Sequence, residues 1–234
     1  MSLKIELVAN RTEQDAGLIL EHLESLDPSV RVRIREEPRS WGSDLRADLV
    51  LHLGSSWSVY WSDIATSVSA AVALLRHAIA RGVPVLGVCF GAQMLSHAFG
   101  GQVERGKKTE IGWHDVVATD SGAPLGGRWM QWHYDSFTCP PGFDTLAIND
   151  AGIQAIRRGR ALGIQFHPEA TEAIVTRWIE GGGAVELANY GLSPSDLLAE
   201  TRRESGRSVV AARDLVQWFL ETVAQGRADE RSNN

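Results

Sequence analysis

Apolar runs and amphipathic segments alternate through the first half of the chain. Runs that are apolar or strictly alternating and that end at turn residues predict strands at residues 4–9, 30–34, 48–53 and 85–88. Segments with apolar residues at helical spacing lie between or after them and predict helices at residues 12–25, 64–80 and 91–99. This order is typical of an α/β protein with a doubly wound, mainly parallel sheet flanked by helices.

The pattern changes after residue 100. Turn residues multiply between residues 102 and 156, which predicts small extra strands and loops laid over the sheet. An apolar strand returns at 161–166, and helical spacing then predicts a helix at 169–179 and a helical C-terminal tail with two helices, around 194–204 and 208–223. We expect a single domain over residues 1–226, followed by a frayed tail at 227–234.

Composition narrows the choice of function. A chain of 234 residues fits one large α/β domain, and its net charge of −6 with no clustered Lys and Arg argues against nucleic-acid binding. No signal peptide opens the sequence, and we expect no segment to cross a membrane. The two cysteines, Cys89 and Cys139, need not form a disulfide in a chain of this size, so a cytoplasmic location is expected.

One of these cysteines lies in a nucleophile-elbow pattern. The strand at 85–88 runs directly into Cys89, which has Gly87 and Gly91 two residues to either side and a helix after it. The glycines let the backbone make a tight turn, and the helix N-terminus favours a thiolate. An isolated cysteine is more often a small buried apolar residue, but this frame favours a nucleophile. Cys139 has no such frame and is interpreted as structural.

A base and its orienting group follow another predicted strand. His167-Pro168-Glu169 comes directly after the apolar run at 161–166. A thiolate nucleophile needs a base, and a buried carboxylate can hold the imidazole in the required tautomer. The sequence therefore predicts a catalytic triad of Cys89, His167 and Glu169.

The sequence Val-Cys-Phe-Gly-Ala-Gln at 88–93, followed by His-Pro-Glu at 167–169, resembles the class I (triad) glutamine amidotransferases. The resemblance covers about residues 45–180 and is strongest to the glutaminase domain of GMP synthase and its stand-alone relatives. It implies that Cys89 attacks the γ-carboxamide of glutamine to form a γ-glutamyl thioester. His167 would protonate the departing ammonia and then activate water, while Glu169 orients it.

The resemblance also implies the groups around the substrate. Gln93 would help to bind glutamine, and the backbone N–H of Phe90 would donate to the oxyanion. The second oxyanion donor would come from Gly54 and Ser55. Relatives often have glycine where Ser55 stands, and a serine is less free to adopt a positive φ. We therefore expect a differently shaped loop, or one that rearranges when substrate binds.

Two further segments resemble the GMP synthase branch more loosely. Glu110 and Trp113 belong to one, and His133 and Asp135 to the other. By resemblance these residues would border the glutamine pocket, although ordinary packing explains Trp113 equally well. The seven histidines are scattered and no phosphate-binding loop is present, so we expect no metal and no cofactor.

Three interpretations of function remain open from the sequence. The chain could be the glutaminase subunit of an amidotransferase and pass ammonia to a separate synthase partner. It could instead hydrolyse γ-glutamyl amides or peptides alone, with a wide apolar rim at residues 57–61 accepting a larger leaving group. A non-catalytic interaction module is the third interpretation, and the intact triad argues against it.

Overall fold

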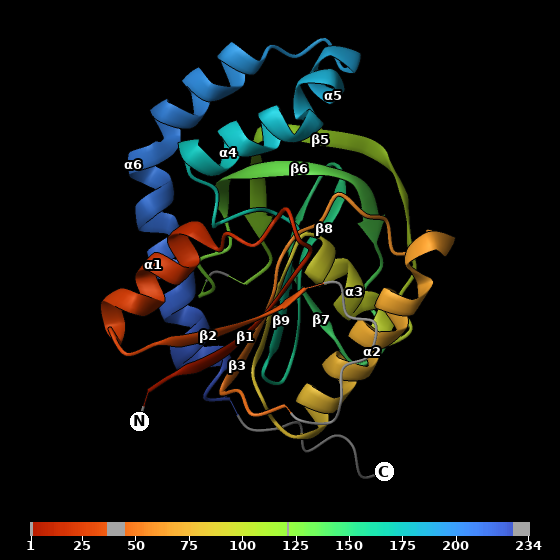
Figure 1. Cartoon of the computed structure of the whole chain (residues 1–234), viewed down its shortest axis with the longest axis vertical. Helices are drawn as coiled ribbons and strands as arrows, with labels where there is room; N and C mark the ends of the chain where they lie inside the picture. Colours follow the sequence, from red (N-terminus) through yellow and green to blue (C-terminus); the bar gives the residue numbers. More distant parts are fainter. Residues whose placement is uncertain (1, 37–44, 121, 227–234) are drawn as a thin grey trace.

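The computed structural model describes residues 2–36, 45–120 and 122–226. Within these residues, nine strands form one mixed sheet in the order β2-β1-β3-β4-β9-β8-β7-β5-β6, with helices on both faces (Figure 1). This confirms the α/β class and the parallel core. The predicted frayed tail at 227–234 lies outside the described residues.

Five neighbouring strands pair in parallel and carry the first half of the chain plus one later strand. They are β1 (Lys4–Ala9), β2 (Arg31–Glu36), β3 (Leu49–His52), β4 (Val85–Val88) and β9 (Ala161–Ile164). Because β3, β4 and β9 are adjacent and parallel, the segments that follow them leave the sheet at the same edge. Residues far apart in sequence therefore meet there.

The other four strands are antiparallel and extend the sheet beyond β9. They are β5 (Val103–Ala118), β6 (Gly127–Phe137), β7 (Asp144–Asn149) and β8 (Gly152–Arg158). The predicted extra strands are present, but their expected place over the sheet is wrong, because β7 and β8 continue the sheet and β5 and β6 form a long hairpin. A register shift between Arg105 and Glu110 interrupts this hairpin, so no regular alternation marks β5 in the sequence.

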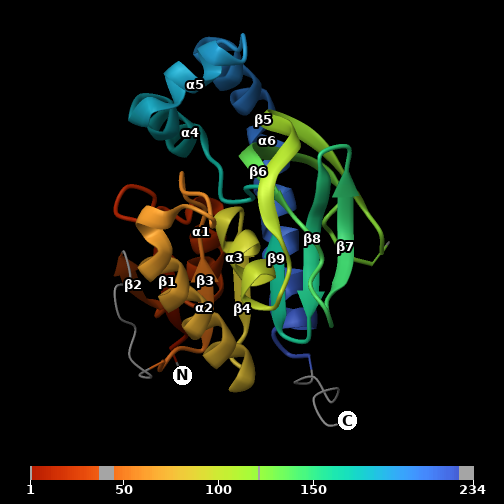
Figure 2. The same cartoon turned by 90° about the vertical axis from the view of Figure 1, so that its right-hand side faces the viewer.

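Helices cover both faces of the parallel half of the sheet (Figure 2). One face packs against α1 (Gly17–Leu26) and α6 (Pro194–Trp218), the latter extended by η3 (Phe219–Val223). The other face packs against α2 (Ala65–Ala80), preceded by η1 (Ser62–Ile64), and α3 (Phe90–Ala98). The buried strands thus have an apolar cover on each side, as their continuous apolar runs require.

A third helical layer lies over the β5–β6 hairpin. It contains α4 (Glu172–Trp178), η2 (Ile179–Gly183) and α5 (Ala184–Asn189). The side chain of Thr171 caps α4 by accepting a hydrogen bond from the backbone N–H of Ile174 at 3.2 Å. Apolar residues of these helices and of early α6 pack on β5 and β6, which closes one end of the molecule.

Two predicted helices differ from the structure. The helix predicted from residue 12 begins only at Gly17, where Asp15 Oδ1 accepts the Gly17 backbone N–H at 2.8 Å. The two helices predicted near the C-terminus are one continuous α6. Its buried residues recur at helical spacing on both sides of Gly206, which is exposed and therefore tolerated within the helix: Leu197, Thr201, Ser208, Ala212, Leu215 and Val216.

The segment Ser62–Ala80 has the length and composition of a membrane-spanning helix, contrary to the sequence expectation. Its place in the fold is that of a core helix. Val68, Leu75 and Ala78 are buried against the sheet and α3, and the opposite side of the helix faces outward.

Replacement of Leu215 by Ala tests whether α6 is part of the domain core. Leu215 is fully buried in the cluster between α6 and the sheet, so we expect its truncation to lower the free energy of unfolding by about 2–5 kcal/mol. The matched control is Val209→Ala in the same helix, where the side chain is 51% exposed and a change within about 0.5 kcal/mol is expected. Urea denaturation of both variants measures the difference. Equal effects would contradict this packing.

Candidate active site

Cys89 occupies a strained turn between β4 and α3. Its φ of 50° and ψ of −106° make it the one non-glycine residue with positive φ in the described part of the chain. The turn is held by the sheet, because the Cys89 backbone N–H donates to Ile164 O at 2.8 Å. Strain of this kind is often found at functional sites, where it fixes a side chain in one direction. The side chain is 4% exposed.

Glycines make this turn possible. A Cβ on Gly91 would lie 2.1 Å from the carbonyl oxygen of His52, and one on Gly87 would lie 2.6 Å from the carbonyl oxygen of Gly91. Both distances are below any van der Waals contact. The spacing Gly-x-Cys-x-Gly is therefore required by close backbone approach at the carboxyl end of β4.

His167 and Glu169 leave the sheet at the same edge, just after β9. The imidazole Nδ1–H donates to Glu169 Oε1 at 2.7 Å, and both side chains are at least 94% buried. The hydrogen bond leaves Nε2 as the nitrogen available to the thiol, and Nε2 has no other partner among the described residues. The ring of Trp178 packs edge-on against the imidazole at a centroid distance of 4.8 Å and shields it from water.

The charges of the triad reinforce one another. Burial lowers the pKa of His167, but the charges of Glu169 and Cys89 outweigh burial and raise that pKa well above its ordinary value. The two charges thus favour the protonated form of His167. The Nε2–H of Gln165 adds a second donor, 3.4 Å from Cys89 Sγ. This arrangement suits a thiolate nucleophile whose partner can donate a proton.

Three backbone N–H groups near Cys89 donate to no other protein atom in the described residues. They belong to Gly54, Ser55 and Phe90. Phe90 begins α3, where the first N–H groups have no intrahelical acceptor. Gly54 lies against the side chains of both His167 and Cys89, since a Cβ there would be 3.0 Å from His167 Cε1 and 3.5 Å from Cys89 Cβ. These donors are suited to an oxyanion beside the thiol.

A cavity of about 740 Å³ opens over the sulfur. It is walled by the loop after β1, the loop after β3, the end of β6, and the α4–α5 layer. Most of the predicted site residues line it: Gly54, Ser55, Cys89, Gln93, His133, Asp135, His167 and Glu169. The structure thus brings together residues from four separate segments of the chain, and their assigned roles stay predictions.

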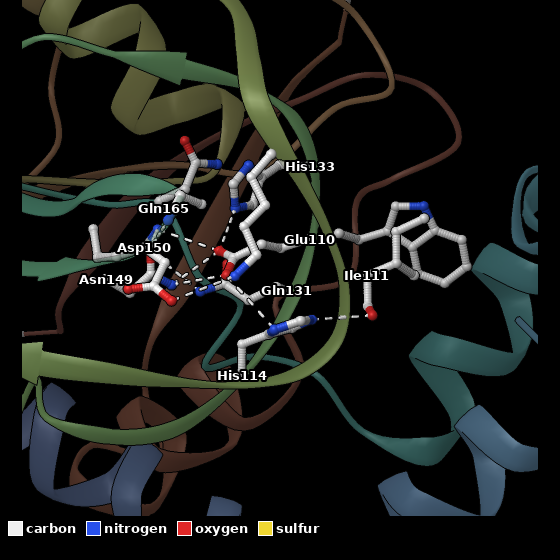
Figure 3. Close-up of polar contacts among 12 residues, drawn as sticks. Glu110, Ile111, His114, Gln131, His133, Asn149, Asp150 and Gln165 are labelled. Carbon is white, nitrogen blue, oxygen red and sulfur yellow. Dashed lines mark hydrogen bonds and ion pairs between the residues drawn. The ribbon is translucent and has the colours of Figure 1, made fainter. Parts of the chain in front are cut away.

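Glu110 does not line the cavity but lies in a buried polar network behind it (Figure 3). Its carboxylate accepts from Asn149 Nδ2 at 3.0 Å and from His133 Nε2 at 3.2 Å. Burial raises the pKa of Glu110, but these hydrogen bonds and the nearby His133 and His114 lower it below its ordinary value.

His133 links this network to the cavity. Its Nδ1 lies 3.0 Å from the carbonyl oxygen of Asp135, and its Nε2 faces the Glu110 carboxylate. The carboxylate of Asp135 accepts the hydroxyl of Tyr60 at 2.9 Å. Glu110 is therefore connected to the cavity only indirectly. It bonds His133, and His133 contacts the backbone of Asp135, which lines the cavity.

Trp113 lies outside the cavity. Its indole N–H donates to Thr201 Oγ1 at 3.1 Å, and the ring is 5% exposed in the layer between β5 and the early part of α6. Packing thus accounts for the position of Trp113, rather than contact with a ligand.

Gln165 is a site residue that the sequence analysis did not single out. It bonds Cys89 Sγ, and its Oε1 accepts from Gln93 Nε2 at 3.2 Å, so the predicted substrate-binding Gln93 is joined to the nucleophile. The signal in the sequence is a polar residue that interrupts an apolar run two positions before His167. Trp178, which packs on His167, has no comparable signal.

Comparisons with known proteins agree with this geometry. Residues 62–175 match the family model of class I glutamine amidotransferases. The chain is 32% identical over 144 residues to the glutamine-hydrolyzing GMP synthase of Aeropyrum pernix, which covers 56% of this chain but 28% of that protein. It is 38% identical over 102 residues to anthranilate synthase component 2 of Archaeoglobus fulgidus, covering 41% of this chain and 57% of that protein.

The fold of the whole chain is also known from solved structures. A glutamine amidotransferase from Thermotoga maritima superposes with a TM-score of 0.84 at 25% identity, covering 95% of this chain and 100% of that one. The chain thus spans about a quarter of the GMP synthase that it matches, but the full length of this structural relative.

Replacement of Glu169 by Gln tests the charge coupling in the triad. The amide can still accept from His167 Nδ1–H, but without its charge the pKa of His167 should fall and the imidazolium should support the thiolate less well. We expect alkylation of Cys89 by iodoacetamide at pH 7 to slow about tenfold, equivalent to ~1.4 kcal/mol.

The matched control is Glu172→Gln, which removes an exposed carboxylate of α4 that pairs with Arg202. Its alkylation rate should equal that of the unaltered chain. A Glu169→Gln variant that reacts as fast as this control would show that Glu169 does not act on the nucleophile.

Proposed function

Because this chain belongs to the class I glutamine amidotransferase family, we propose that it hydrolyses the γ-carboxamide of glutamine through a γ-glutamyl thioester on Cys89 and releases ammonia. The observation that supports this most directly is the placement of the His167–Glu169 pair and three unpaired backbone N–H groups around one strained, buried cysteine.

The proposed reaction has two halves. The Cys89 thiolate attacks the amide carbon, and the resulting oxyanion receives hydrogen bonds from the N–H groups of Phe90 and of the Gly54–Ser55 segment. The His167 imidazolium gives its proton to the departing nitrogen, so ammonia leaves and the thioester remains. His167, now neutral, removes a proton from water, which attacks the thioester and releases glutamate and the thiolate.

The substrate would lie in the cavity with its amide over the sulfur. Gln165 donates to the sulfur and accepts from Gln93, while Gln93, His133 and Asp135 line the cavity. The Asp135 carboxylate suits the α-ammonium group of a glutamyl substrate, since a charge-assisted hydrogen bond is strong at a site only 5% exposed. No metal or cofactor is needed in this scheme.

We further propose that the ammonia serves a separate synthase subunit. A relative named as a component of anthranilate synthase and a match to a quarter of a GMP synthase support a donor role. We also propose a cytoplasmic location. Both cysteines are free, which suits the reducing conditions of that compartment.

The size of the cavity favours a second candidate, a self-sufficient γ-glutamyl amide or peptide hydrolase. A volume of about 740 Å³ lies in the range that holds drug-sized ligands, roughly 300–1,000 Å³, and exceeds the needs of free glutamine. Aromatic side chains form much of its outer wall, namely Trp57, Trp132, Tyr134 and Trp178. A larger leaving amine could pack there with the same triad chemistry.

Release of glutamate from glutamine and from a panel of γ-glutamyl amides by the purified chain tests the proposal. We expect turnover that Cys89→Ala lowers by at least about 10³-fold, because the nucleophile is lost. Cys139→Ala is the matched control and should retain full activity, since that half-buried thiol lies outside the cavity.

The substrate preference decides between the two candidates. A higher kcat/KM for glutamine supports an ammonia donor, and a higher value for a bulky γ-glutamyl amide supports the self-sufficient hydrolase. Absence of turnover with a rapidly alkylated Cys89 would indicate that a partner subunit is required. Absence of turnover with an unreactive Cys89 would contradict the catalytic proposal.

A further inference from the structure

Two loops meet at the rim of the cavity on the side of the proposed oxyanion. The first is the β1–α1 loop, residues 10–16, and the second is the oxyanion loop, residues 54–58, which follows β3. Both line the cavity, and residues of each form hydrogen bonds to the other. Neither the triad nor the predicted substrate groups include a residue of the β1–α1 loop.

Hydrogen bonds from one loop fix the other at two consecutive residues. Glu13 Oε2 accepts the backbone N–H of Ser56 at 3.1 Å, and Asn10 Nδ2 donates to Ser55 Oγ at 2.9 Å. Asn10 also donates to Glu13 Oε2, which links the two contacts. The Asn10 amide is itself held, because its Oδ1 accepts from the backbone and side chain of Thr12 at 3.1 Å each.

Asn10 and Glu13 together form a clamp on the oxyanion loop. Among the described residues, this clamp leaves two backbone N–H groups of the loop without a protein acceptor. On one side of the oxyanion loop, Leu53 N–H donates to Val8 O at 2.9 Å, and on the other side Ser56 N–H donates to Glu13. In the described structure the two N–H groups between them, of Gly54 and Ser55, donate to no protein atom. Anchors on both sides therefore leave these two donors unpaired beside Cys89 and His167.

Within the oxyanion loop, the Trp57 N–H donates to Ser55 Oγ at 3.2 Å, and Asn10 and Glu13 add contacts from outside the loop. Ser55 lacks the positive φ that glycine would allow, since Cys89 is the one described non-glycine residue in that region. A small apolar cavity of about 30 Å³, lined by Gly54 and Ser55 among others, adjoins the loop. Without contacts from the rim, its peptide groups could turn away from the sulfur.

We propose that Glu13 is a positioning residue, which acts with Asn10 to hold the oxyanion loop so that the Gly54 and Ser55 N–H groups face the reacting carbonyl oxygen. This inference rests on the proposed amide hydrolysis. Glu13 does not touch the reacting atoms, and its effect is transmitted through the Ser56 amide.

The carboxylate form of Glu13 is the form that clamps. Burial is the largest influence on the pKa of Glu13 and raises it, and the nearby charge of Glu186 raises it further. The hydrogen bonds from Ser56 and Asn10 and the charge of His167 lower this pKa, but by less, so it remains above its ordinary value. On the same rim, Asp15 and Arg177 pair with each other. As the pH falls through this raised pKa, the protonated carboxyl accepts less well and the clamp weakens.

Two substitutions at residue 13 separate the clamp from a general structural role. Glu13→Gln can place its Oε1 where Oε2 accepts both hydrogen bonds, so it should retain most of the kcat. Glu13→Ala removes the acceptor, and we expect kcat to fall about 10²-fold with little change in KM, as when an oxyanion donor is lost. Glu21→Ala, an exposed carboxylate of α1, is the matched control and should match the unaltered chain.

The pH profile adds a readout that misfolding would not give. The ratio of the kcat of the unaltered chain to that of Glu13→Gln should fall as the pH is lowered, because protonation weakens the carboxylate as an acceptor, whereas the acceptor strength of the amide oxygen does not change with pH. Alkylation of Cys89 should be unchanged in Glu13→Ala, since that reaction uses the nucleophile without an oxyanion.

Hydrogen exchange of the Ser56 amide tests the clamp without any turnover. The amide should exchange faster in Glu13→Ala than in the unaltered chain or in Glu13→Gln. Equal exchange in all three, or an undiminished kcat in Glu13→Ala, would overturn the proposal. If the unaltered chain hydrolyses no substrate and its Cys89 is not alkylated, the proposed function fails, and the exchange of Ser56 still decides whether Glu13 holds the loop.

Discussion

The active site depends on the parallel register between β4 and β9. Val88 lies opposite Ile164, and the Cys89 backbone N–H donates to Ile164 O, so the two chains leave the sheet together. A slip of one residue would move Cys89 by about 3.3 Å along β9 and reverse the faces of the strand. Because Gly87 and Gly163 pair in this register, α3 can also approach both strands closely. The distance between nucleophile and base is thus set by backbone hydrogen bonds.

The strain at Cys89 is the local cost of this arrangement. A non-glycine residue at positive φ costs on the order of 1–3 kcal/mol, which the surrounding hydrogen bonds and packing must offset. The offset comes from the fully buried strands on either side and from α3, where the N–H groups of Ala92 and Gln93 donate back to Cys89 O. The thiol is thereby directed into the cavity instead of into the core.

The sequence predicts the parts of the site that lie within short segments. The elbow at Cys89 and the His167-Pro168-Glu169 segment are readable because strand, turn and chemistry are contiguous. Contacts between distant segments are not readable in this way. Glu13 and Ser56 meet only because β1 and β3 are neighbours, and Gln165 reaches the sulfur only because β9 pairs with β4. Two elements are also hard to predict from the sequence. The charged strand β5 contains a bulge, and α6 contains the exposed Gly206, so in each case tertiary packing stabilises an element that its local sequence does not mark clearly.

The position of β9 has a consequence during synthesis. Strands β5 to β8 come between β4 and β9 in sequence, although β4 and β9 are adjacent in the sheet. At roughly 5–20 residues per second, Cys89 emerges from the ribosome several seconds before His167 and Gln165 do. Throughout that interval the nascent chain carries an ordinary thiol, without a base or a donor beside the sulfur. Cys89 gains the neighbouring His167 and Gln165 only when β9 takes its place between β4 and β8.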